Sequence, residues 1–575
     1  MNKAHCVLSP DESIKSSVQK ITQVPHQGGE AGIAVIVDES RKVLGVVSDG
    51  DIRKAICNNV DFNGPISGIM NKNPICVLHD LNGTQMLKDF LAQMRQKNVK
   101  VHRLVAIDQD RRFVDIINVH DLYQNIDITQ RKIAVYGMGF VGLTLALTLA
   151  EDNVFQVVGV DANKDVVRKL QDGVPSFFEA GLVPLLRQLL IEKNIAFTDD
   201  YKKVSADVHI ISVGTPVGPD AKPVMKDLQT VGEQIGSLLK KGDLVICRST
   251  VPVGVTRNFL VPILEKVSKL SAGSGFHVAF APERTVEGKA LKELRSLPQI
   301  IGGYSHMCSE LTESIFKKIT KTTVRVDSLE EAELVKLLNN TFRDLVFSFA
   351  NEVSFMCDKF NINAFKLIDA ANEGYPRNPI PKPSPGVGGI CLSKDPYLYS
   401  SQSSEQLFAN VQLGKVSRSI NERGAEYVMW QFDKYLEQNP KIKCKDMKIL
   451  VAGLAFKGVP ETSDIRFSHA VDLIKALQQR GCKVCGFDAV VTSEDIAKLG
   501  VSPVSIAEGL EGASAVFFMN NHPDNLKFDV FEGVKSMQSP AYFFDGWNLF
   551  DAWEVESLPN ATYATLGYRT KKQDA

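Results

Sequence analysis

One cysteine stands in a setting that suits nucleophilic chemistry. Cys391 lies in the segment GVGGICLSKDP, where glycines precede it and Lys394 and Asp395 follow it. A structural cysteine usually lies within an apolar run, whereas glycines let a substrate approach the backbone and the sulfur closely. Nearby cations can lower the pKa of a thiol and raise its thiolate fraction. The residues alone leave two interpretations open, a covalent nucleophile and a buried structural thiol.

A glycine-rich turn upstream has the spacing of a dinucleotide site. Gly137, Gly139 and Gly142 form G-x-G-x-x-G directly after the apolar run at residues 132–136. The first glycine permits a tight turn, the second lets the backbone approach a pyrophosphate, and the third lets a helix pack against the strand. The N-terminus of that helix favours phosphate. Asp161 ends the next strand, where a carboxylate would bind a ribose diol and repel a 2′-phosphate. NAD is the predicted cofactor; alternatively, the glycines only permit close packing.

Parallel sheets are needed to position these groups, and the chain alternates accordingly. In residues 128–326 the strand-like runs FQVVGVDAN, VHIISVGTPV, DLVICRSTVPVG and HVAFAPE follow the glycine turn and alternate with helical segments, which is the βαβ pattern. Residues 327–438 begin with a long apolar helix that we expect to be buried or to form an interface. Residues 439–575 start a second α/β cycle at MKILVAGLAFKG. We predict an α/β fold with two Rossmann-like doubly wound domains joined by a long central helix.

Residues 1–127 contain an internal repeat. AVIVDESRKVLGVVSDGDI aligns without gaps with LVAIDQDRRFVDIINVHDL at an offset of 70 residues. Each copy has the pattern of a strand, a polar turn, a strand and the start of a helix, and two copies can bury one another's apolar faces. The segment resembles a tandem cystathionine-β-synthase-type (CBS) pair, an α+β module.

The CBS resemblance implies an adenine nucleotide in the cleft between the repeats. The implied ribose-binding residues are Ser48, Asp51, Asn118 and Asp121. Two alternatives remain: these residues cap helices, as Ser, Asn and Asp do, or the pair is a dimer scaffold without a ligand. Regulation would require different ligand affinities in two enzyme states.

The segment from about residue 131 to residue 568 resembles the UDP-glucose/GDP-mannose dehydrogenase family. Its motifs occur in the family's order: VYGMGFVG, RSTVPVG, APERTVEG, EAELVKLLNNTFRD, GVGGICLSKDP and GLAFKGVPETSDIRFS. The family oxidises a sugar CH₂OH to a carboxylate with two NAD⁺. The implied catalytic residues are Cys391, Lys336, Asp395, Asn340, Glu287 and Thr250. The implied cofactor-binding residues are Gly137, Gly139, Phe140, Val141, Gly142, Asp161, Thr215, Thr250 and Glu287. The implied substrate-binding residues are Glu283, Lys336, Asn340, Arg377, Gly388, Lys457 and Arg466.

These roles fit the chemistry of two successive oxidations. A water held by Lys336, Asp395 and Thr250 would take the hydroxyl proton, and the lysine would stabilise the developing alkoxide. The Cys391 thiolate would then attack the aldehyde and form a thiohemiacetal. A thioester follows, and Glu287 would orient or deprotonate the water that hydrolyses it.

The nucleotide side of the site is implied by the third segment. Lys457 follows the strand MKILVA, and Asp464 with Arg466 matches the family's D-x-R. Arginine supplies a fork for phosphate oxygens. Two extra residues separate the lysine from the D-x-R here, and Ser463 stands where the family often has an acid, which leaves the loop geometry open.

The loop before the cysteine bears on the choice of sugar. YPRNPIPKPSPGVGG, with Arg377, resembles the branch that oxidises UDP-N-acetylhexosamines, although Ile390 departs from the histidine common in that branch. We therefore favour a UDP-N-acetylhexosamine, oxidised for surface polysaccharide precursors. UDP-glucose and GDP-mannose are the alternatives.

Composition and charge exclude several other classes of protein. The net charge is -1, and the Lys and Arg residues are scattered, which argues against nucleic acid. No apolar run approaches the ~20 residues that span a membrane, and MNKAHCVLSPDES lacks the core of a signal peptide, so we expect a cytoplasmic protein. The 10 cysteines make no disulfide framework, and Cys482 and Cys485 fall in a strand-like run, so no metal is expected. The apolar central helix predicts a homodimer or a larger homo-oligomer.

Two other functions were weighed against the four-electron dehydrogenase. A catalytically weak nucleotide sensor should have lost at least one of the catalytic residues, and all are present. A two-electron dehydrogenase of hydroxy acids would need neither the cysteine nor the second nucleotide-binding half.

Overall fold

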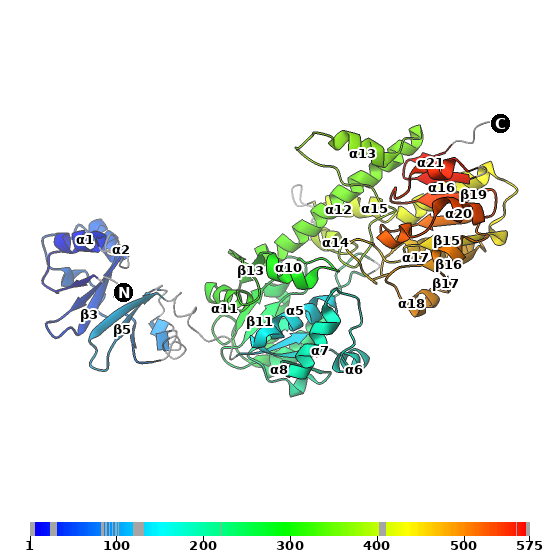
Figure 1. Cartoon of the computed structure of the whole chain (residues 1–575). Coiled ribbons are helices and arrows are strands. Elements are labelled where there is room, and N and C mark those ends of the chain that lie inside the picture. Colours follow the sequence, from blue (N-terminus) through cyan, green and yellow to red (C-terminus); the bar gives the residue numbers. More distant parts are fainter. Residues whose placement is uncertain are drawn as a thin grey trace. The chain divides into compact units, whose positions relative to one another are not determined.

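The computed structural model describes residues 6–23, 32–81, 86, 89–90, 93–94, 96–97, 101, 103–118, 131–218, 220–401, 410–558 and 561–570. The chain divides into two compact units, Met1–Gln130 and Arg131–Ala575 (Figure 1). Each unit is described by itself. In the part of the chain that is described, no helix has the length and apolarity to cross a membrane.

The N-terminal unit contains two equivalent three-stranded sheets. One has the order β1 (Val7–Leu8), β2 (Ile33–Val37), β3 (Val43–Ser48), and the other the order β4 (Cys76–Leu78), β5 (Arg103–Ile107), β6 (Phe113–Asn118). The helices α1 (Ile14–Gln23) and α2 (Asp49–Cys57) belong to the first repeat. Both hairpins are antiparallel, and each has a register shift at the same point of the repeat. Arg41 and Arg111, which the offset of the repeat pairs, both have φ 63°. The structure thus confirms the repeat.

The two repeats share one hydrophobic core. Val35 and Val43 of the first repeat pack with Val105 and Phe113 of the second. Backbone hydrogen bonds join the two hairpins at the turns, from the Val43 N–H to the Arg111 carbonyl and from the Phe113 N–H to the Arg41 carbonyl. The expectation that each copy buries the apolar face of the other is therefore confirmed.

The first half of the larger unit is a doubly wound sheet. The described residues form eight strands in the order β14-β13-β12-β11-β10-β7-β8-β9, parallel except between β12 and β13. In chain order the strands are β7 (Lys132–Tyr136), β8 (Gln156–Val160), β9 (Ile195–Thr198), β10 (Val208–Ile211), β11 (Leu244–Cys247), β12 (His277–Phe280), β13 (Gln299–Gly303) and β14 (Thr323–Val326). The helices are α5 (Phe140–Ala150), α6 (Lys164–Gln171), α7 (Leu182–Glu192), α8 (Lys226–Leu238), α9 (Val261–Ser268), α10 (Ala290–Ser296) and α11 (His306–Phe316). The direction of strand addition reverses between β7 and β10, which is where such sheets bind ligands.

The second half repeats this architecture. Its seven described strands have the order β17-β16-β15-β18-β19-β20-β21, and all pairs are parallel except β20 with β21. The strands are β15 (Lys448–Ala452), β16 (Lys483–Phe487), β17 (Ser502–Pro503), β18 (Ala515–Phe518), β19 (Ala541–Asp545), β20 (Ala561–Thr565) and β21 (Tyr568–Arg569). The helices are α16 (Gly424–Gln438), α17 (His469–Gln479), α18 (Ser493–Lys498), α19 (Ile506–Leu510), α20 (Val530–Ser536) and α21 (Ala552–Glu556). The switch point lies between β15 and β18.

A long helix joins the two halves. Helix α12 (Leu329–Phe360) has 32 residues and runs from the first sheet toward the second half in Figure 1. Ser328 caps its N-terminus by accepting a hydrogen bond from the Glu331 N–H, and Asn361 ends it in the left-handed conformation. Helices α13 (Ala364–Asn372), α14 (Asp395–Ser400) and α15 (Leu413–Asn421) follow, and α12 packs against α14 and α15. The predicted architecture of two Rossmann-like domains and a central helix is confirmed.

Helix α16 belongs by its packing to the second half. It lies within the segment 327–438 that we expected to be a central domain, but Val428, Phe432 and Tyr435 are buried in the core of the second sheet with Phe517 and Tyr542. The division of the larger unit into segments 128–326, 327–438 and 439–575 therefore stays a prediction.

Candidate active site

A cleft of about 940 Å³ brings most of the predicted site residues together. Its volume is in the range of cofactor and small-molecule sites. The cleft is lined by both halves of the larger unit, by α12 and by the loop before α14. The predicted residues among its lining are Gly137, Gly139, Phe140, Val141, Asp161, Thr215, Thr250, Glu283, Glu287, Lys336, Asn340, Gly388, Cys391, Lys457 and Arg466.

Three predicted residues do not line the cleft. Gly142 packs behind the glycine turn, Asp395 is completely buried, and Arg377 is exposed and lies over the ring of Tyr375, 5.8 Å from its centroid. Arg377 follows α13 in a proline-rich loop. The sequence of such a loop does not show how far its side chains lie from the cleft. Its predicted contact with the substrate stays a prediction.

The glycine turn has the geometry that a dinucleotide requires. Gly137 has φ +92°, and a Cβ on Gly142 would come within 1.8 Å of the Gly137 carbonyl oxygen, so α5 can pack this close only with glycine. A Cβ on Gly139 would meet no atom within 4 Å, because Gly139 faces the cleft. The Asp161 carboxylate accepts hydrogen bonds of 2.8 Å from the N–H groups of Met138 and Asn163. A pyrophosphate on the open side of Gly139 and a ribose at Asp161 therefore fit this site.

The cleft runs between the switch points of the two sheets. The Thr215 hydroxyl donates to the Thr250 carbonyl and so ties the loops after β10 and β11 together. Across the cleft, the Gly458 N–H donates to the Asn521 side chain at 3.0 Å, which ties the loops after β15 and β18. Each half therefore presents the carboxyl ends of its central strands to the same space.

The loop that carries Cys391 is wedged between the two halves. The Cys391 carbonyl accepts hydrogen bonds from the N–H groups of Lys394 and Asp395, at 3.3 and 3.0 Å, and these start α14. A Cβ on Gly388 would lie 2.2 Å from the Phe467 carbonyl oxygen, and one on Gly389 would lie 2.6 Å from the Phe456 ring. The glycines therefore admit the loop that follows β15, which is a different reason from the substrate approach that we expected.

The Cys391 side chain is exposed to the cleft, and its charge environment is mixed. The pKa of the Cys391 thiol is raised overall, and burial is the largest cause. Asp395 and Glu287 also raise it, whereas Lys336 and Lys394 lower it. We expected nearby cations to lower this pKa, but burial and the two carboxylates outweigh them. The thiol is therefore protonated at neutral pH in the ligand-free protein and has to lose its proton before it can act as a nucleophile.

Asp395 acts behind the cleft wall. It is 0% exposed, and its carboxylate accepts the Asn340 amide at 2.5 Å and the Lys394 ammonium at 2.8 Å. These contacts fix the rotamer of Asn340 and neutralise Lys394. Asp395 is not among the residues that line the cleft and its contacts orient Asn340, so the predicted role in holding a water stays a prediction.

Lys336 is the reactive cation on α12. It lies four residues before Asn340, on the same face of the helix, and is 6% exposed. Its ammonium makes no hydrogen bond or ion pair with any residue that the structure describes. An unpaired ammonium in a cleft can stabilise negative charge that develops on a substrate oxygen.

Glu287 is held at the boundary between the halves. Its carboxylate accepts the Thr462 hydroxyl at 3.1 Å, and its carbonyl oxygen accepts the Lys457 ammonium at 2.7 Å. Burial raises the pKa of Glu287, and the neighbouring charge of Asp464 raises it further. A carboxylate with a raised pKa is suited to accept a proton from water. The segment with the two extra residues packs directly against this loop, because a Cβ on Gly288 would lie 2.5 Å from the Glu461 carbonyl oxygen.

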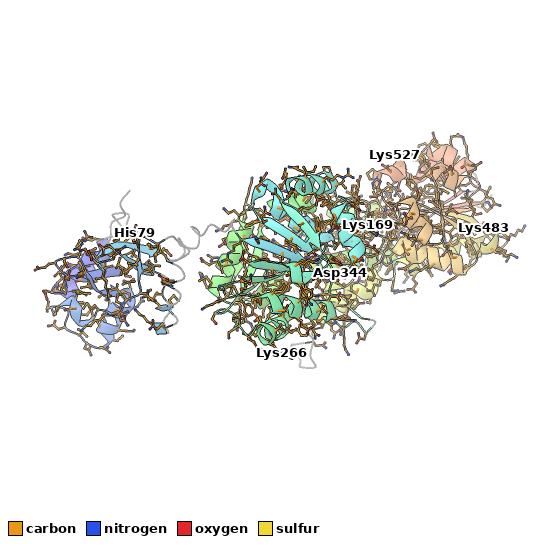
Figure 2. The ribbon with its side chains drawn as sticks, turned by 90° about the horizontal axis from the view of Figure 1, so that it is seen from below. His79, Lys169, Lys266, Asp344, Lys483 and Lys527 are labelled. Atoms are coloured by element: carbon orange, nitrogen blue, oxygen red, sulfur yellow. The ribbon has the colours of Figure 1, made fainter. Side chains whose placement is uncertain are left out.

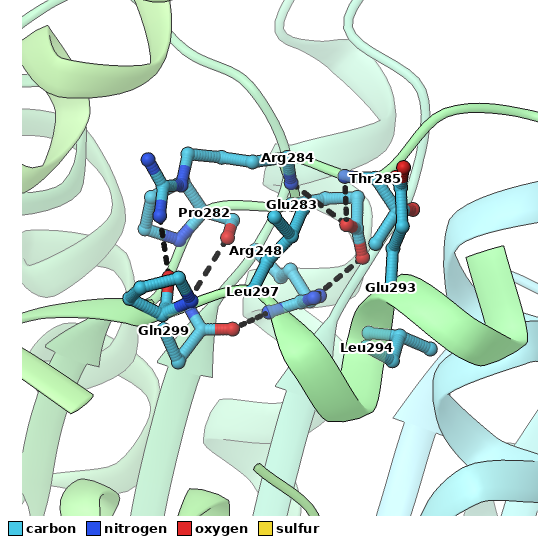
Figure 3. A pocket seen from close by; sticks show the side chains of 10 residues that line it. Arg248, Pro282, Glu283, Arg284, Thr285, Glu293, Leu294, Leu297 and Gln299 are labelled. Carbon is cyan, nitrogen blue, oxygen red and sulfur yellow. Dashed lines mark hydrogen bonds and ion pairs between the residues drawn. The ribbon is translucent and has the colours of Figure 1, made fainter. Parts of the chain in front are cut away.

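The loop that carries Glu287 is anchored by a buried arginine that sequence reasoning missed (Figure 3). Arg248 donates to Glu283 at 2.5 Å, to the Gln299 side chain at 3.0 Å and to the Ala281 carbonyl at 3.0 Å. Its place directly after β11, in the RST motif, was the available signal.

Glu283 is fully engaged by these partners. Its other carboxylate oxygen accepts the N–H groups of Arg284 and Thr285, each at 2.7 Å. Burial alone would raise the pKa of Glu283, but Arg248 and the Thr285 N–H hold it below its ordinary value. Glu283 thus orders the loop as a permanent anion, and its predicted contact with the substrate stays a prediction.

A buried polar network holds the cysteine loop from the other side. Arg418 of α15, 1% exposed, donates to the Asp344 carboxylate of α12 at 2.8 Å and to the Val387 carbonyl at 3.2 Å. The Asn421 side chain donates to the same Asp344 oxygen at 2.8 Å. Asp344, on α12, lies in the middle of the larger unit in Figure 2. The network therefore ties α12 and α15 to the backbone just before Cys391.

The proposed ligand residues of the N-terminal unit form a helix cap. The Ser48 hydroxyl accepts the Asp51 N–H, and the Asp51 carboxylate accepts the Ser48 N–H at 2.9 Å, which is a capping box at the start of α2. Asn118 ends β6, and Asp121 lies outside the described residues. The capping alternative therefore describes Ser48 and Asp51, and a ligand role stays a prediction.

Metal-binding clusters were sought in the described ranges. There, no group of three or more His, Cys, Asp or Glu side chains is placed to hold a metal ion. Cys482 and Cys485 are buried free thiols on and next to β16.

Family models match most of the chain. The NAD-binding domain of the UDP-glucose/GDP-mannose dehydrogenase family matches residues 131–320, its central domain residues 330–423, and its UDP-binding domain residues 450–552. The CBS domain matches residues 1–58 and 66–127.

Similar proteins are known from several organisms. UDP-N-acetyl-D-mannosamine dehydrogenase of Pyrococcus horikoshii is 32% identical over 421 residues, 73% of this chain and 96% of that protein. UDP-N-acetyl-D-glucosamine 6-dehydrogenase of Salmonella typhi is 31% identical over 66% of this chain and 87% of its own length. The solved structure of the Pyrococcus horikoshii UDP-D-ManNAc dehydrogenase covers 76% of this chain and 99% of its own, with a TM-score of 0.68 and 30% identity.

The Asp344–Arg418 pair can be tested directly. Asp344→Asn leaves the buried guanidinium uncompensated, and we expect the free energy of unfolding to fall by about 3–5 kcal/mol. Asp433→Asn breaks an ion pair with Arg480 whose side chains are 40% and 38% exposed, and is the matched control with an expected loss of about 0–1 kcal/mol. Urea unfolding of the full chain measures both. Equal, small losses in the two variants would show that the pair does not hold the cysteine loop.

Proposed function

Because the chain belongs to the UDP-glucose/GDP-mannose dehydrogenase family, whose members are NAD-dependent nucleotide-sugar dehydrogenases, we propose that it oxidises the 6-hydroxymethyl group of a UDP-N-acetylhexosamine to a carboxylate. The observation that carries this proposal is the single cleft in which Cys391, Lys336, Asn340 and Glu287 lie together with the glycine turn of the cofactor site. A covalent nucleophile beside a dinucleotide site is what a four-electron oxidation requires.

The sugar is proposed from the relatives. UDP-N-acetyl-D-mannosamine dehydrogenases of Pyrococcus horikoshii and Campylobacter jejuni and the UDP-N-acetyl-D-glucosamine 6-dehydrogenase of Salmonella typhi are each at least 31% identical to this chain. A UDP-glucose dehydrogenase structure from Pyrobaculum islandicum is 25% identical. The acetamido sugars are therefore favoured, and UDP-glucose is the second candidate. The proposed role is to supply uronic acids for surface polysaccharides.

In the first oxidation the chain removes the proton of the hydroxyl group. The glycine turn and Asp161 would hold NAD⁺, which would supply the hydride acceptor for each of the two oxidations at the sugar C6. The Lys336 ammonium donates to the hydroxyl oxygen and stabilises the alkoxide that develops as the proton leaves. A water held between Lys336 and Thr250 on the cleft wall takes that proton. Asn340 is kept in place by Asp395 and positions the same oxygen.

In the second oxidation Cys391 traps the aldehyde. The thiol gives up its proton, the sulfur bonds to C6, and the carbonyl oxygen takes up a proton to give a thiohemiacetal. Lys336 lowers the pKa of the Cys391 thiol against the effect of burial, so the same ammonium favours the thiolate. When the thiohemiacetal oxygen loses its proton again, Lys336 and Asn340 stabilise the negative charge on it, and the product is a thioester.

Hydrolysis completes the reaction. Glu287 takes a proton from a water whose oxygen attacks the thioester carbonyl carbon. The C6–S bond breaks, the electron pair returns to sulfur, and Cys391 regains a proton. The products are the uronate and the free thiol.

The N-terminal unit is proposed to bind an adenine nucleotide. The CBS models match both repeats, and the two hairpins share one core; these two observations support a ligand held between the repeats near Ser48 and Asn118. The ligand would have to replace or extend the Ser48–Asp51 cap. A nucleotide that binds with different affinities in two enzyme states would regulate the dehydrogenase.

The outer face of α12 is proposed to form a homodimer. Four apolar side chains on it, Leu338, Phe342, Phe349 and Met356, are 46%, 67%, 53% and 67% exposed, and the last three repeat every seven residues, which is two helical turns. Leu413 and Val416 of the adjacent α15 are also exposed. An apolar face of this kind is covered by a second copy of the chain.

The substrate proposal predicts two NADH for each UDP-N-acetylglucosamine or UDP-N-acetylmannosamine consumed. Purified wild-type protein is assayed at 340 nm with each of these sugars and with UDP-glucose, with and without AMP or ATP. Cys391→Ser should form no uronate, because the aldehyde is no longer trapped. Turnover of UDP-glucose alone would overturn the choice of sugar. The proposal that the N-terminal unit binds an adenine nucleotide would be overturned if AMP and ATP neither bind to the protein nor change the rate.

The dimer proposal predicts that a charge on α12 separates the protomers. Phe349→Glu places a carboxylate in the proposed apolar interface, where its desolvation is unfavourable. Light scattering after size exclusion should show the mass of the oligomer fall by half. Ile191→Glu is the matched control, because Ile191 is 82% exposed on α7 and away from this face. A wild type that already has the mass of one chain would refute the proposal.

A further inference from the structure

Arg343 on the cleft wall has no partner among the residues that the structure describes. Arg343 lies on α12, three residues after Asn340 and seven after Lys336, on the same face of the helix. Its side chain is exposed and lines the cleft. It makes no hydrogen bond or ion pair with any residue for which the structure gives a description. An arginine held in a binding cleft without an acceptor is available for a ligand anion.

The other arginines and lysines of the cleft are largely occupied. Arg248 is paired with Glu283, Lys394 with Asp395 and Lys382 with Asp369. Arg284 donates to the Pro298 carbonyl and Lys457 to the Glu287 carbonyl. The positive charge in the cleft that faces no carboxylate within ion-pair distance therefore belongs to Lys336, Arg343, Arg284 and Lys457.

Arg466 does not offer the free fork that the sequence suggested. Its Nε and Nη2 atoms both bind the Asp464 carboxylate, at 2.8 and 2.7 Å. The edge of the guanidinium formed by Nε and Nη2 is thus paired within the D-x-R segment, and Nη1 makes no bond there. Arg343 differs from it because neither edge of its guanidinium is engaged by a residue that the structure describes.

Arg343 and Lys457 come to the cleft from different elements. Arg343 comes from α12, and Lys457 from the loop after β15 in the UDP-binding half; both line the cleft. Burial is the main cause that lowers the pKa of Lys457; Glu287, Glu179 and Cys391 raise it, and the positive charge of Arg343 makes a smaller contribution that lowers it. Two cations that repel each other across a cleft are stabilised by an anion between them.

We propose that Arg343 binds the diphosphate of the nucleotide sugar, together with Lys457 of the loop after β15. The assignment rests on the proposed function, since it requires a nucleotide-sugar substrate. Seven residues place Arg343 about 10 Å along the helix axis from Lys336, and the pyranose ring separates the reacting C6 from the phosphates in the substrate. A planar guanidinium suits two phosphate oxygens at once. Arg343 is therefore a binding residue that sets the register of the sugar over Cys391.

Arg343 would bind a pair of anionic oxygens, and the substrate and product together offer two such groups. The diphosphate is present in substrate and product, whereas the C6 carboxylate exists only in the product. UDP carries the first without the second. Binding of UDP therefore separates the two sources without any turnover.

The test is calorimetric titration of UDP, and then of the UDP-N-acetylhexosaminuronate, into the full chain. We compare wild type, Arg343→Gln, Arg343→Lys and the control Arg168→Gln, whose arginine is an exposed partner of Asp165 on α6. Arg343→Gln should weaken UDP binding about tenfold to a hundredfold, as loss of a charge-assisted hydrogen bond does. Arg343→Lys should recover part of the loss because it keeps the charge without the fork. Arg168→Gln should bind like the wild type, and the affinity for NADH should be the same in all four proteins, which checks the fold.

Three outcomes would overturn the assignment. Equal UDP affinity in wild type and Arg343→Gln would remove the diphosphate role. A loss confined to the uronate would place the guanidinium on the product carboxylate instead. A wild type that binds NADH but not UDP would overturn the proposed function itself, and the diphosphate assignment with it.

Discussion

The position of Cys391 depends on the buried ion pair between Asp344 and Arg418. The pair lies at the crossing of α12 and α15, and Arg418 also binds the Val387 carbonyl, four residues before the cysteine. On the other side, Gly388 and Gly389 admit the loop of the UDP-binding half to within contact of the backbone. The cysteine loop is thus fixed both to the central helix and to the second half. Closure of the two halves and placement of the nucleophile are consequences of the same packing.

The charged side chains around the cleft fall into two groups: those that are paired with an opposite charge and those that have no such partner among the described residues. Arg248 with Glu283 and Lys394 with Asp395 are compensated within the protein, and they hold a loop or a side chain in place. Among the described residues, Lys336, Arg343, Arg284 and Lys457 line the cleft without a carboxylate within ion-pair distance. Since an anionic substrate and a developing oxyanion both need positive charge that is not already neutralised, we propose that Lys336 serves the reacting C6 and Arg343 the diphosphate.

Much of the fold could be predicted from the spacing of apolar residues and glycines, because these elements depend on residues that are close in the sequence. The G-x-G-x-x-G turn, the repeat with its paired turns at Arg41 and Arg111, and the long helix are each contained in one continuous segment, and each is present in the structure. The candidate site is also brought together as predicted, since Cys391, Lys336, Asn340 and Glu287 line one cleft.

What could not be predicted depends on pairing across long sequence separations. Asp344 and Arg418 are 74 residues apart, and no periodicity shows that they meet. For the same reason the sequence did not show that burial outweighs the cations at Cys391, or that Asp395 is hidden behind Asn340. The pairing of Arg466 with Asp464 is local, but it depends on side-chain rotamers that no pattern of residue types determines. Arg377 was placed in the site by resemblance, and within one chain it lies outside the cleft.

We propose that the reaction passes through a covalent bond between the sugar C6 and Cys391. The variant Glu287→Gln should trap this intermediate. This variant should form the thioester but hydrolyse it about 10²–10⁴-fold more slowly, because the proton acceptor for water is gone. Acid quenching after mixing with NAD⁺ and UDP-N-acetylglucosamine, followed by intact mass and peptide analysis, measures the adduct. We expect an added acyl group on the peptide that contains Cys391, and no such group when Cys391→Ser is introduced as well. Turnover to the uronate with no adduct at any time, or an adduct that persists in the Cys391→Ser background, would contradict it.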